Sequence, residues 1–143
     1  MRLRSSLRLR RLATVALALV GSLAASTGHA GAADSRSVAS VLSAVGKSVE
    51  RGTIVVGPAR DFGTIVHLRV MHQPPGVLQP AEIHAGTCAK YAPEPHYVLS
   101  LVLNGKSDSR IDVARREMLA DGGVVIVRIS RMREDVVACG KIG

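Results

Sequence analysis

The stretch GTIVHLRVM, residues 63–71, decides the fold class because apolar and polar side chains alternate along it. One face carries the aliphatic residues Val66, Leu68 and Val70. The other face carries Ile65, His67, Arg69 and Met71. This period of two is typical of a strand with one buried face. A Pro-Pro-Gly sequence follows at residues 74–76, so we predict a short strand that ends in a turn.

Short aliphatic runs separated by Gly and Pro predict seven or eight strands in all. The runs are Thr53–Val56, Ala81–His84, Tyr97–Leu103, Ser109–Ala114, Val124–Ile129 and Val136–Cys139. Val38–Val45 fits a strand or a helix, Arg116–Ala120 predicts a helical turn, and residues 85–96 predict a long loop. The chain has one Phe, two Tyr and no Trp, so aliphatic residues must build the core. This pattern predicts an all-β sandwich or barrel of short strands.

The first 32 residues predict a secretory signal peptide. Residues 2–11 are basic, residues 12–26 are apolar, and Ala30-Gly31-Ala32 forms a small-x-small cleavage site. The apolar stretch would rise only about 22 Å as a helix, short of the ~30 Å hydrocarbon core. An uncleaved membrane anchor is the alternative. We therefore expect a protein that is periplasmic or secreted, has no membrane anchor after cleavage, and folds as one domain over residues 33–143.

The net charge of +8 comes mainly from this leader. From residue 33 onward, 14 Lys and Arg stand against 11 Asp and Glu, a net charge of +3. This small excess and the scarcity of aromatic side chains argue against nucleic-acid binding. Arginines interleaved with acidic residues occupy positions 115, 116, 128, 131 and 133. We interpret them as a mixed solvated face, and the alternative is a patch that binds an anion or an acidic partner.

Cys88 and Cys139 are the only cysteines. Export places them in an oxidising compartment, where two cysteines normally pair, so we predict a disulfide. A reactive thiol or a metal ligand is the alternative, although neither residue belongs to a CxxC motif.

Three segments together resemble the copper/zinc superoxide dismutases and their small secreted relatives. They are AEIHAGTC at residues 81–88, GVVIVRI at 123–129 and ACGKI at 138–142. In that family a His-containing strand leads to a Cys that pairs with a Cys in the terminal strand. The resemblance spans most of residues 50–142 and implies a Greek-key β-sandwich of antiparallel strands held by one disulfide.

The resemblance also implies a metal site that is largely missing. The first His-x-His pair of ligands reads Glu82-Ile83-His84 here, and His96 is the candidate for the bridging histidine. Arg128 stands where the last copper-binding His is expected, and Arg keeps its charge in proteins, so it cannot ligate a cation. The Arg that guides the substrate aligns with Val136. We therefore predict no cofactor, with His84 and His96 as the candidate ligands for Cu or Zn, joined by His67 or His72 only if the fold brings one of them near.

The function that follows is a non-catalytic, exported β-sandwich module, binding or structural, with an unidentified protein or surface as partner. In this interpretation His84 packs beside the disulfide and bonds through one ring nitrogen. A copper- or zinc-handling protein that uses His84 and His96 is the alternative, and an active superoxide dismutase is the more remote one. Fold resemblance by itself establishes neither activity.

Overall fold

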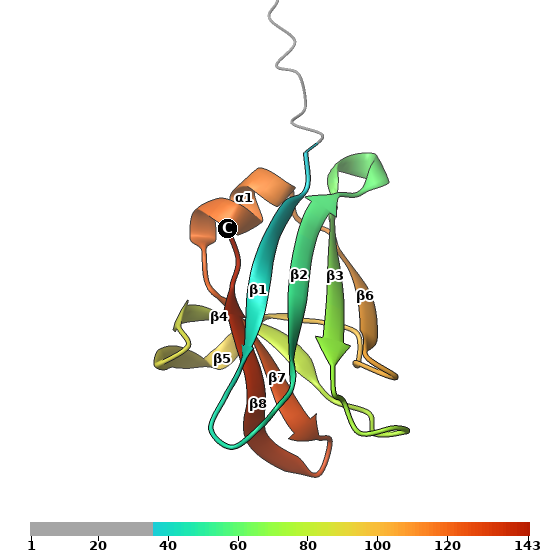
Figure 1. The fold of residues 1–143 in the computed structure, drawn as a ribbon. Coiled ribbons are helices and arrows are strands. Elements are labelled where there is room, and N and C mark those ends of the chain that lie inside the picture. The colour runs from blue at the N-terminus through green and yellow to red at the C-terminus, as the bar shows by residue number, and fades with distance from the viewer. Residues whose placement is uncertain (1–35) are drawn as a thin grey trace, which may run out of the picture. The chain divides into compact units, whose positions relative to one another are not determined.

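The computed structural model describes residues 36–143, and the predicted signal peptide lies outside them (Figure 1). Eight strands form one sheet in the order β5-β4-β7-β8-β1-β2-β3-β6, and every neighbouring pair is antiparallel. The strands are β1 Val38–Ala44, β2 Arg51–Pro58, β3 Thr64–Met71, β4 Ala81–Thr87, β5 Lys90–Val98, β6 Lys106–Ile111, β7 Val124–Ser130 and β8 Arg133–Lys141. Two short helices accompany them, η1 Arg60–Phe62 and α1 Arg115–Asp121. The predicted all-β antiparallel class is confirmed.

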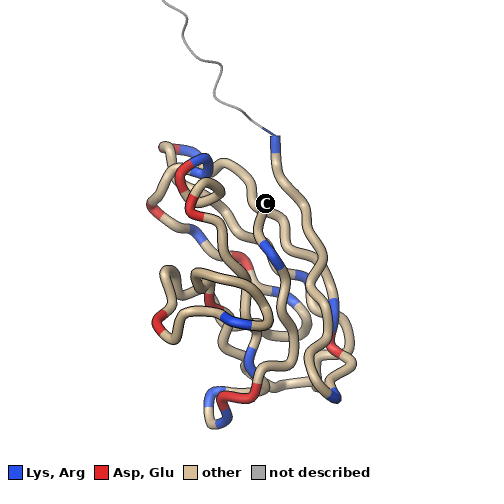
Figure 2. The backbone as a smooth tube through the Cα atoms, turned by 90° about the vertical axis from the view of Figure 1, so that its left-hand side faces the viewer, with Lys and Arg blue, Asp and Glu red and all other residues tan. Residues whose placement is uncertain are grey.

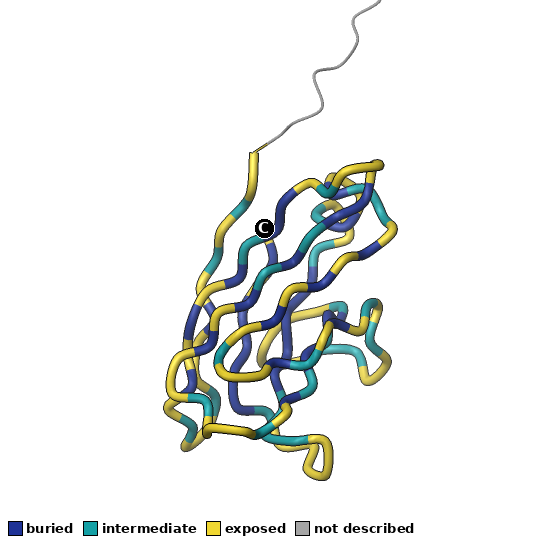
Figure 3. The backbone as a smooth tube through the Cα atoms, turned by 90° about the vertical axis from the view of Figure 1, so that its right-hand side faces the viewer, coloured by how far each residue is buried: buried dark blue, intermediate teal, exposed yellow. Residues whose placement is uncertain are grey.

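The alternation predicted for residues 63–71 is confirmed in β3. Val66, Leu68 and Val70 are buried, while Arg69 and Met71 are exposed. The exposed and buried positions alternate along the neighbouring strands in the same way, as Figure 3 shows. One face of this part of the sheet is therefore solvated and the other builds the core, as expected for antiparallel strands.

The sheet curls so that its two halves enclose one core. The β1 strand belongs to both halves, because residues 38–42 pair with β2 whereas Ser43 and Ala44 pair with β8. The core cluster accordingly joins residues of both halves, among them Leu42, Ile54 and Leu68 from one and Ile83, Val125 and Val127 from the other. Met118 of α1 is also fully buried there. Aliphatic side chains thus fill the core, as predicted.

The two edge strands, β5 and β6, are connected through side chains. Residues 99–103 follow β5, and Val102 bridges to Gln79 ahead of β4. The Ser100 amide donates to Ser109 Oγ at 2.8 Å, and Ser107 Oγ donates to the Ser100 carbonyl at 2.6 Å. Serine hydroxyls of β6 therefore satisfy backbone groups that a regular ladder would otherwise pair.

Two predicted segments differ from the structure. Residues 85–96 were expected to form a long loop, but most of them belong to the β4–β5 hairpin. Prolines at 93 and 95 are tolerated because β5 is an edge strand, where one row of amides needs no ladder partner. The strand expected at Tyr97–Leu103 ends at Val98, where the serine hydrogen bonds replace the ladder. The ambiguous segment Val38–Val45 is a strand, and the helical turn at Arg116–Ala120 lies within α1.

Candidate functional site

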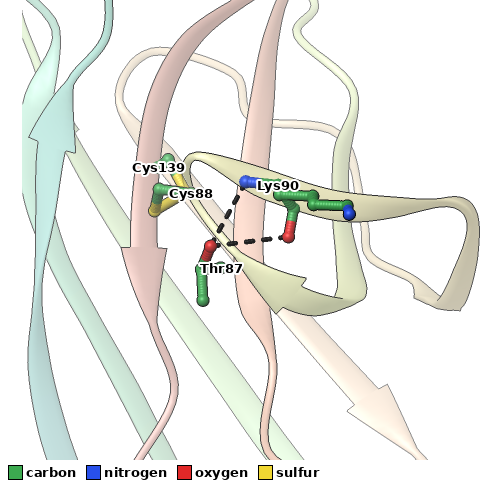
Figure 4. The surroundings of a disulfide bond; sticks show 4 residues. All are labelled: Thr87, Cys88, Lys90 and Cys139. Atoms are coloured by element: carbon green, nitrogen blue, oxygen red, sulfur yellow. Dashed lines mark hydrogen bonds between the residues drawn. A yellow bond between two sulfur atoms is a disulfide. The ribbon is translucent and has the colours of Figure 1, made fainter.

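The tip of the β4–β5 hairpin is tied to β8 by the predicted disulfide (Figure 4). Cys88 and Cys139 have their Cα atoms 5.8 Å apart. The Lys90 amide donates to Thr87 Oγ1 at 3.2 Å and closes the turn. Gly86 has a φ of +111° and lies so close to Lys90 that a Cβ would come within 2.5 Å of its carbonyl oxygen. Glycine is therefore needed where the hairpin tightens toward the disulfide.

This hairpin tip, residues 85–92, is called the strap because it covers the outer face of β7 and β8. Tyr91 of the strap packs on Val124, Ile126 and Cys139, which form a second buried cluster apart from the main core. The sheet is thus buried on both faces here, which explains why residues 124–127 are an unbroken apolar run rather than an alternating one.

His84 lies beneath the strap and is fully buried. Its Nδ1 is 2.7 Å from the Ala92 carbonyl oxygen, and its Nε2 is 3.1 Å from Glu82 Oε2. The Tyr91 ring meets it edge-on, with centroids 5.1 Å apart. The expectation of one bonded ring nitrogen was therefore wrong, since Glu82, two residues away on the same face of β4, takes the second.

Arg128 joins the same carboxylate from β7. Its Nε lies 3.2 Å from Glu82 Oε2, and its Nη1 donates to the Glu134 carbonyl at 2.9 Å. The side chains of Arg128 and Glu82 are only 18% and 21% exposed. Glu82, His84 and Arg128 are called the Glu82 cluster below. Arg128, which cannot ligate a cation, thus lies against the Glu82 carboxylate.

The hydrogen-bonding geometry of the Glu82 cluster requires an additional proton. Both ring nitrogens of His84 face oxygen acceptors, whereas a neutral imidazole has only one N–H. The second proton resides on Nε2, giving an imidazolium, or on the Glu82 carboxyl, which then donates to Nε2. Either arrangement leaves no free lone pair on His84.

The two candidate metal ligands, His84 and His96, lie in different environments. His84 is buried under the strap, whereas His96 is exposed on β5 with its ring edge-on to Tyr97. Among residues 36–143, no group of three or more His, Cys, Asp or Glu side chains is placed to hold a metal ion. The residues present therefore do not fit the copper and zinc centre that the resemblance implies.

A different histidine forms an exposed ion pair on the solvated face of the sheet. His67 Nδ1 lies 2.6 Å from Asp108 Oδ1, and Arg69 Nη1 donates to the same oxygen at 2.9 Å. The hydrogen bonds from His67 and then Arg69 lower the pKa of Asp108. All three side chains are about half exposed, so solvent screens the interaction.

Four connections meet at the end of the sheet opposite η1 and α1, and sequence reasoning did not single them out. They are residues 45–50, 71–80, 103–106 and 130–135, together called the loop end (Figure 1). A hollow of about 430 Å³ opens between three of them, lined by aliphatic residues such as Val45, Val49 and Val136 together with polar ones such as Lys47 and Glu50. Gln73 connects two of these segments, because its Nε2 donates to the Val102 carbonyl and its Oε1 accepts from the Gly105 backbone amide.

Glu50 and Gln79 form a buried pair behind this hollow. Gln79 Nε2 donates to Glu50 Oε1 at 3.0 Å and is 3.4 Å from the Ile129 carbonyl. Glu50 Oε2 and Gln79 Oε1 are buried and have no hydrogen-bond partner among the described residues. Burial raises the pKa of Glu50, and the hydrogen bond from Gln79 opposes that shift. A proton on Glu50 would supply the missing donor.

No sequence signal pointed to this pair, because Glu50 stands in an ordinary polar segment. No helix among residues 36–143 has the length and apolar character needed to cross a bilayer. No family model matches the chain, and no curated protein or solved structure matches it. The resemblance to the superoxide dismutases therefore rests on the residues quoted from the sequence and stays a prediction.

Proposed function

We propose that this protein is an exported, disulfide-stabilised β module that acts by binding or as a structural part rather than by catalysis. The observation that carries the proposal is that both ring nitrogens of His84 already have hydrogen-bond partners. Its two ring nitrogens are bonded to Ala92 and Glu82, and Arg128 holds the carboxylate from the other side. A metal ion could bind this buried histidine only by displacing one of these two partners from a ring nitrogen.

We further infer a superoxide dismutase-like Greek key. The strand order supports this inference, because β6 returns to lie beside β3 and β7 returns to lie beside β4. Such returns are what distinguish a Greek key from a simple meander. The disulfide between the end of β4 and the terminal strand is the second point of agreement with the family pattern. Fold does not carry activity with it, so the module remains non-catalytic in this proposal.

Localisation in the periplasm or outside the cell is part of the same proposal. A disulfide is consistent with an oxidising, exported compartment, and the basic-apolar-small order of the first 32 residues supports export. Expression with the full leader in an exporting bacterial host tests this directly. We expect the protein outside the cytoplasm, with a mass that corresponds to cleavage near Ala32. Full-length protein confined to the cytoplasm would contradict it.

Metal titration of that preparation tests the non-catalytic assignment. We expect no stoichiometric Cu or Zn by elemental analysis and no binding tighter than ~100 μM by calorimetry, since functional metal sites bind far more tightly. His84→Ala and His96→Ala serve as a matched pair. Tight binding that both substitutions abolish would replace the proposal with a metal-handling protein.

A further inference from the structure

The loop end collects most of the exposed aliphatic side chains of the described chain. Eight large apolar residues are exposed between residues 36 and 143. Five of them lie on the loop-end connections, namely Val49, Met71, Leu78, Leu103 and Met132. Met132, at the β7–β8 turn, is 92% exposed. Because exposed apolar side chains grouped in one place mark interaction surfaces, the loop end is the favoured contact surface of this module.

The charges on the loop end are mostly basic. Lys47 and Arg131 of the loop end, and Arg51 directly after residue 50, are exposed and make no ion pair with other described residues. At the β7–β8 turn, where Figure 2 shows blue and red together, Arg133 already pairs with Asp135 at 2.7 Å. Of the acidic groups there, Glu134 alone is exposed without an ion pair, while Glu50 is buried with a raised pKa. The surface available to a partner is therefore positive.

The opposite end of the sheet provides a contrast. Phe62 of η1 is also 92% exposed, but it is the one large apolar side chain exposed on η1 or α1. Five exposed basic residues lie at that end, Arg36, Arg60, Arg110, Arg116 and Lys141, and four exposed acidic residues offset most of their charge, Asp61, Asp112, Glu117 and Asp121. With one exposed large apolar side chain instead of five, this end offers much less apolar burial at a bilayer surface than the loop end.

We propose that the loop end binds the surface of an anionic lipid bilayer, with Met132 and Val49 entering the interface and Lys47, Arg51 and Arg131 facing the headgroups. Basic residues near an anionic leaflet are attracted to it, and apolar side chains between them add burial. Five aliphatic side chains from four connections suit a fluid interface, which needs no preformed pocket. This inference rests on the proposed export, which brings the module to a membrane surface.

The experiment uses a single tryptophan as reporter, because the chain has none. Met132→Trp and Phe62→Trp place it at equally exposed positions on opposite ends of the sheet. Each exported, leader-cleaved variant is titrated with vesicles of phosphatidylglycerol and phosphatidylcholine in equal parts, and with phosphatidylcholine alone. We expect the emission of Met132→Trp to move to shorter wavelength with the anionic vesicles only, and that of Phe62→Trp to stay unchanged. Arg131→Gln should weaken the partitioning of Met132→Trp about fivefold, and 0.5 M salt should weaken it further.

Three outcomes would overturn the proposal. They are no shift for Met132→Trp, an equal shift for Phe62→Trp, and partitioning that is unaffected by Arg131→Gln or by vesicle charge. No shift at either position would leave a protein as the partner of the module. The cleaved mass and the metal titration are measured on the same preparation, so a failure of vesicle binding is distinguishable from a failure of the proposed function.

Discussion

Glu82 and Glu50 are two carboxylates withdrawn from solvent in different parts of one small domain, and their surroundings treat them in opposite ways. Glu82 meets the His84 ring and the Arg128 guanidinium. Glu50 meets only the neutral amide of Gln79 and keeps one oxygen without a partner. Neighbouring cations stabilise a buried carboxylate, whereas desolvation without them favours the neutral acid. The comparison teaches that two carboxylates largely withdrawn from solvent can have very different partners, an imidazole and a guanidinium in one case and a single amide in the other.

The two sites also differ in how they are covered. The Glu82 cluster lies beneath the strap, which the disulfide ties to β8. The Glu50–Gln79 pair lies behind an open hollow at the loop end, among connections joined by hydrogen bonds alone. Stability is therefore expected to concentrate at the strap, and contact with a partner at the loop end.

Removal of the disulfide should have the largest effect. The double substitution Cys88→Ser with Cys139→Ser avoids a free thiol and releases a cross-link between positions 51 apart. We expect a loss of about 4 kcal/mol in the chain-entropy model, or a fall in Tm of roughly 20 °C, measured by circular dichroism. A fall of only one or two degrees would show that packing of Tyr91 holds the strap without the bridge.

Glu82→Gln should have the next largest effect. It removes the negative charge between His84 and Arg128, and hydrogen bonds to charged groups contribute about 2 kcal/mol each. We expect the free energy of unfolding in urea to fall by about 2 kcal/mol. Glu94→Gln, at an exposed glutamate of β5, is the matched control and should change it by less than about 0.5 kcal/mol. Equal effects of the two substitutions would show that the Glu82 cluster makes no special contribution to stability.

Glu50→Gln should act in the opposite direction. The raised pKa of Glu50 means that the folded state holds its proton at a pH where the unfolded chain has lost it. Stability contributed by this group is therefore full below the ordinary glutamate pKa of about 4.3 and declines as pH rises toward the raised pKa. A glutamine side chain carries its own donor for Gln79 Oε1.

We expect Glu50→Gln to be more stable than the native protein by about 1 kcal/mol at pH 7, with the difference shrinking by pH 4. Urea unfolding at both pH values measures this difference, and Glu134→Gln, at an exposed acid of the loop end, is the control. A variant that is less stable at pH 7 than the native protein would mean that Glu50 is ionised and satisfied in the folded state.

Asp108→Asn should have the smallest effect. The hydrogen bonds from His67 and Arg69 lower the pKa of Asp108, so its stabilisation is present above the unfolded pKa and is lost as pH falls through the lower folded value. Solvent exposure limits it to less than about 1 kcal/mol. We expect a slight destabilisation at pH 7 that vanishes in acid and in high salt. A fall in the free energy of unfolding as large as that of Glu82→Gln would show that the exposed carboxylate stabilises the fold as much as the buried one.

The strands and the disulfide were predictable because their causes are local or compositional. Alternation at residues 63–71 reports a strand with one buried face, whatever its neighbours are. Two cysteines behind a predicted export signal have few alternatives to pairing. The β5 strand was not predictable, since Pro93 and Pro95 disfavour a ladder everywhere except at an edge, and edges are assigned only when the sheet is complete.

The sequence by itself therefore determined the all-β class, the aliphatic core and the disulfide. Tertiary structure alone decided that Arg128 and His84 bond the same Glu82 oxygen, and that Glu50 shares a buried position with Gln79. It also decided that exposed aliphatic and basic residues from four connections meet at one end. The physical reason is that hydrogen bonds between side chains depend on strand register and sheet curvature, which bring together residues as far apart in sequence as 82 and 128. The alternation of a strand, in contrast, can be recognised from consecutive residues alone.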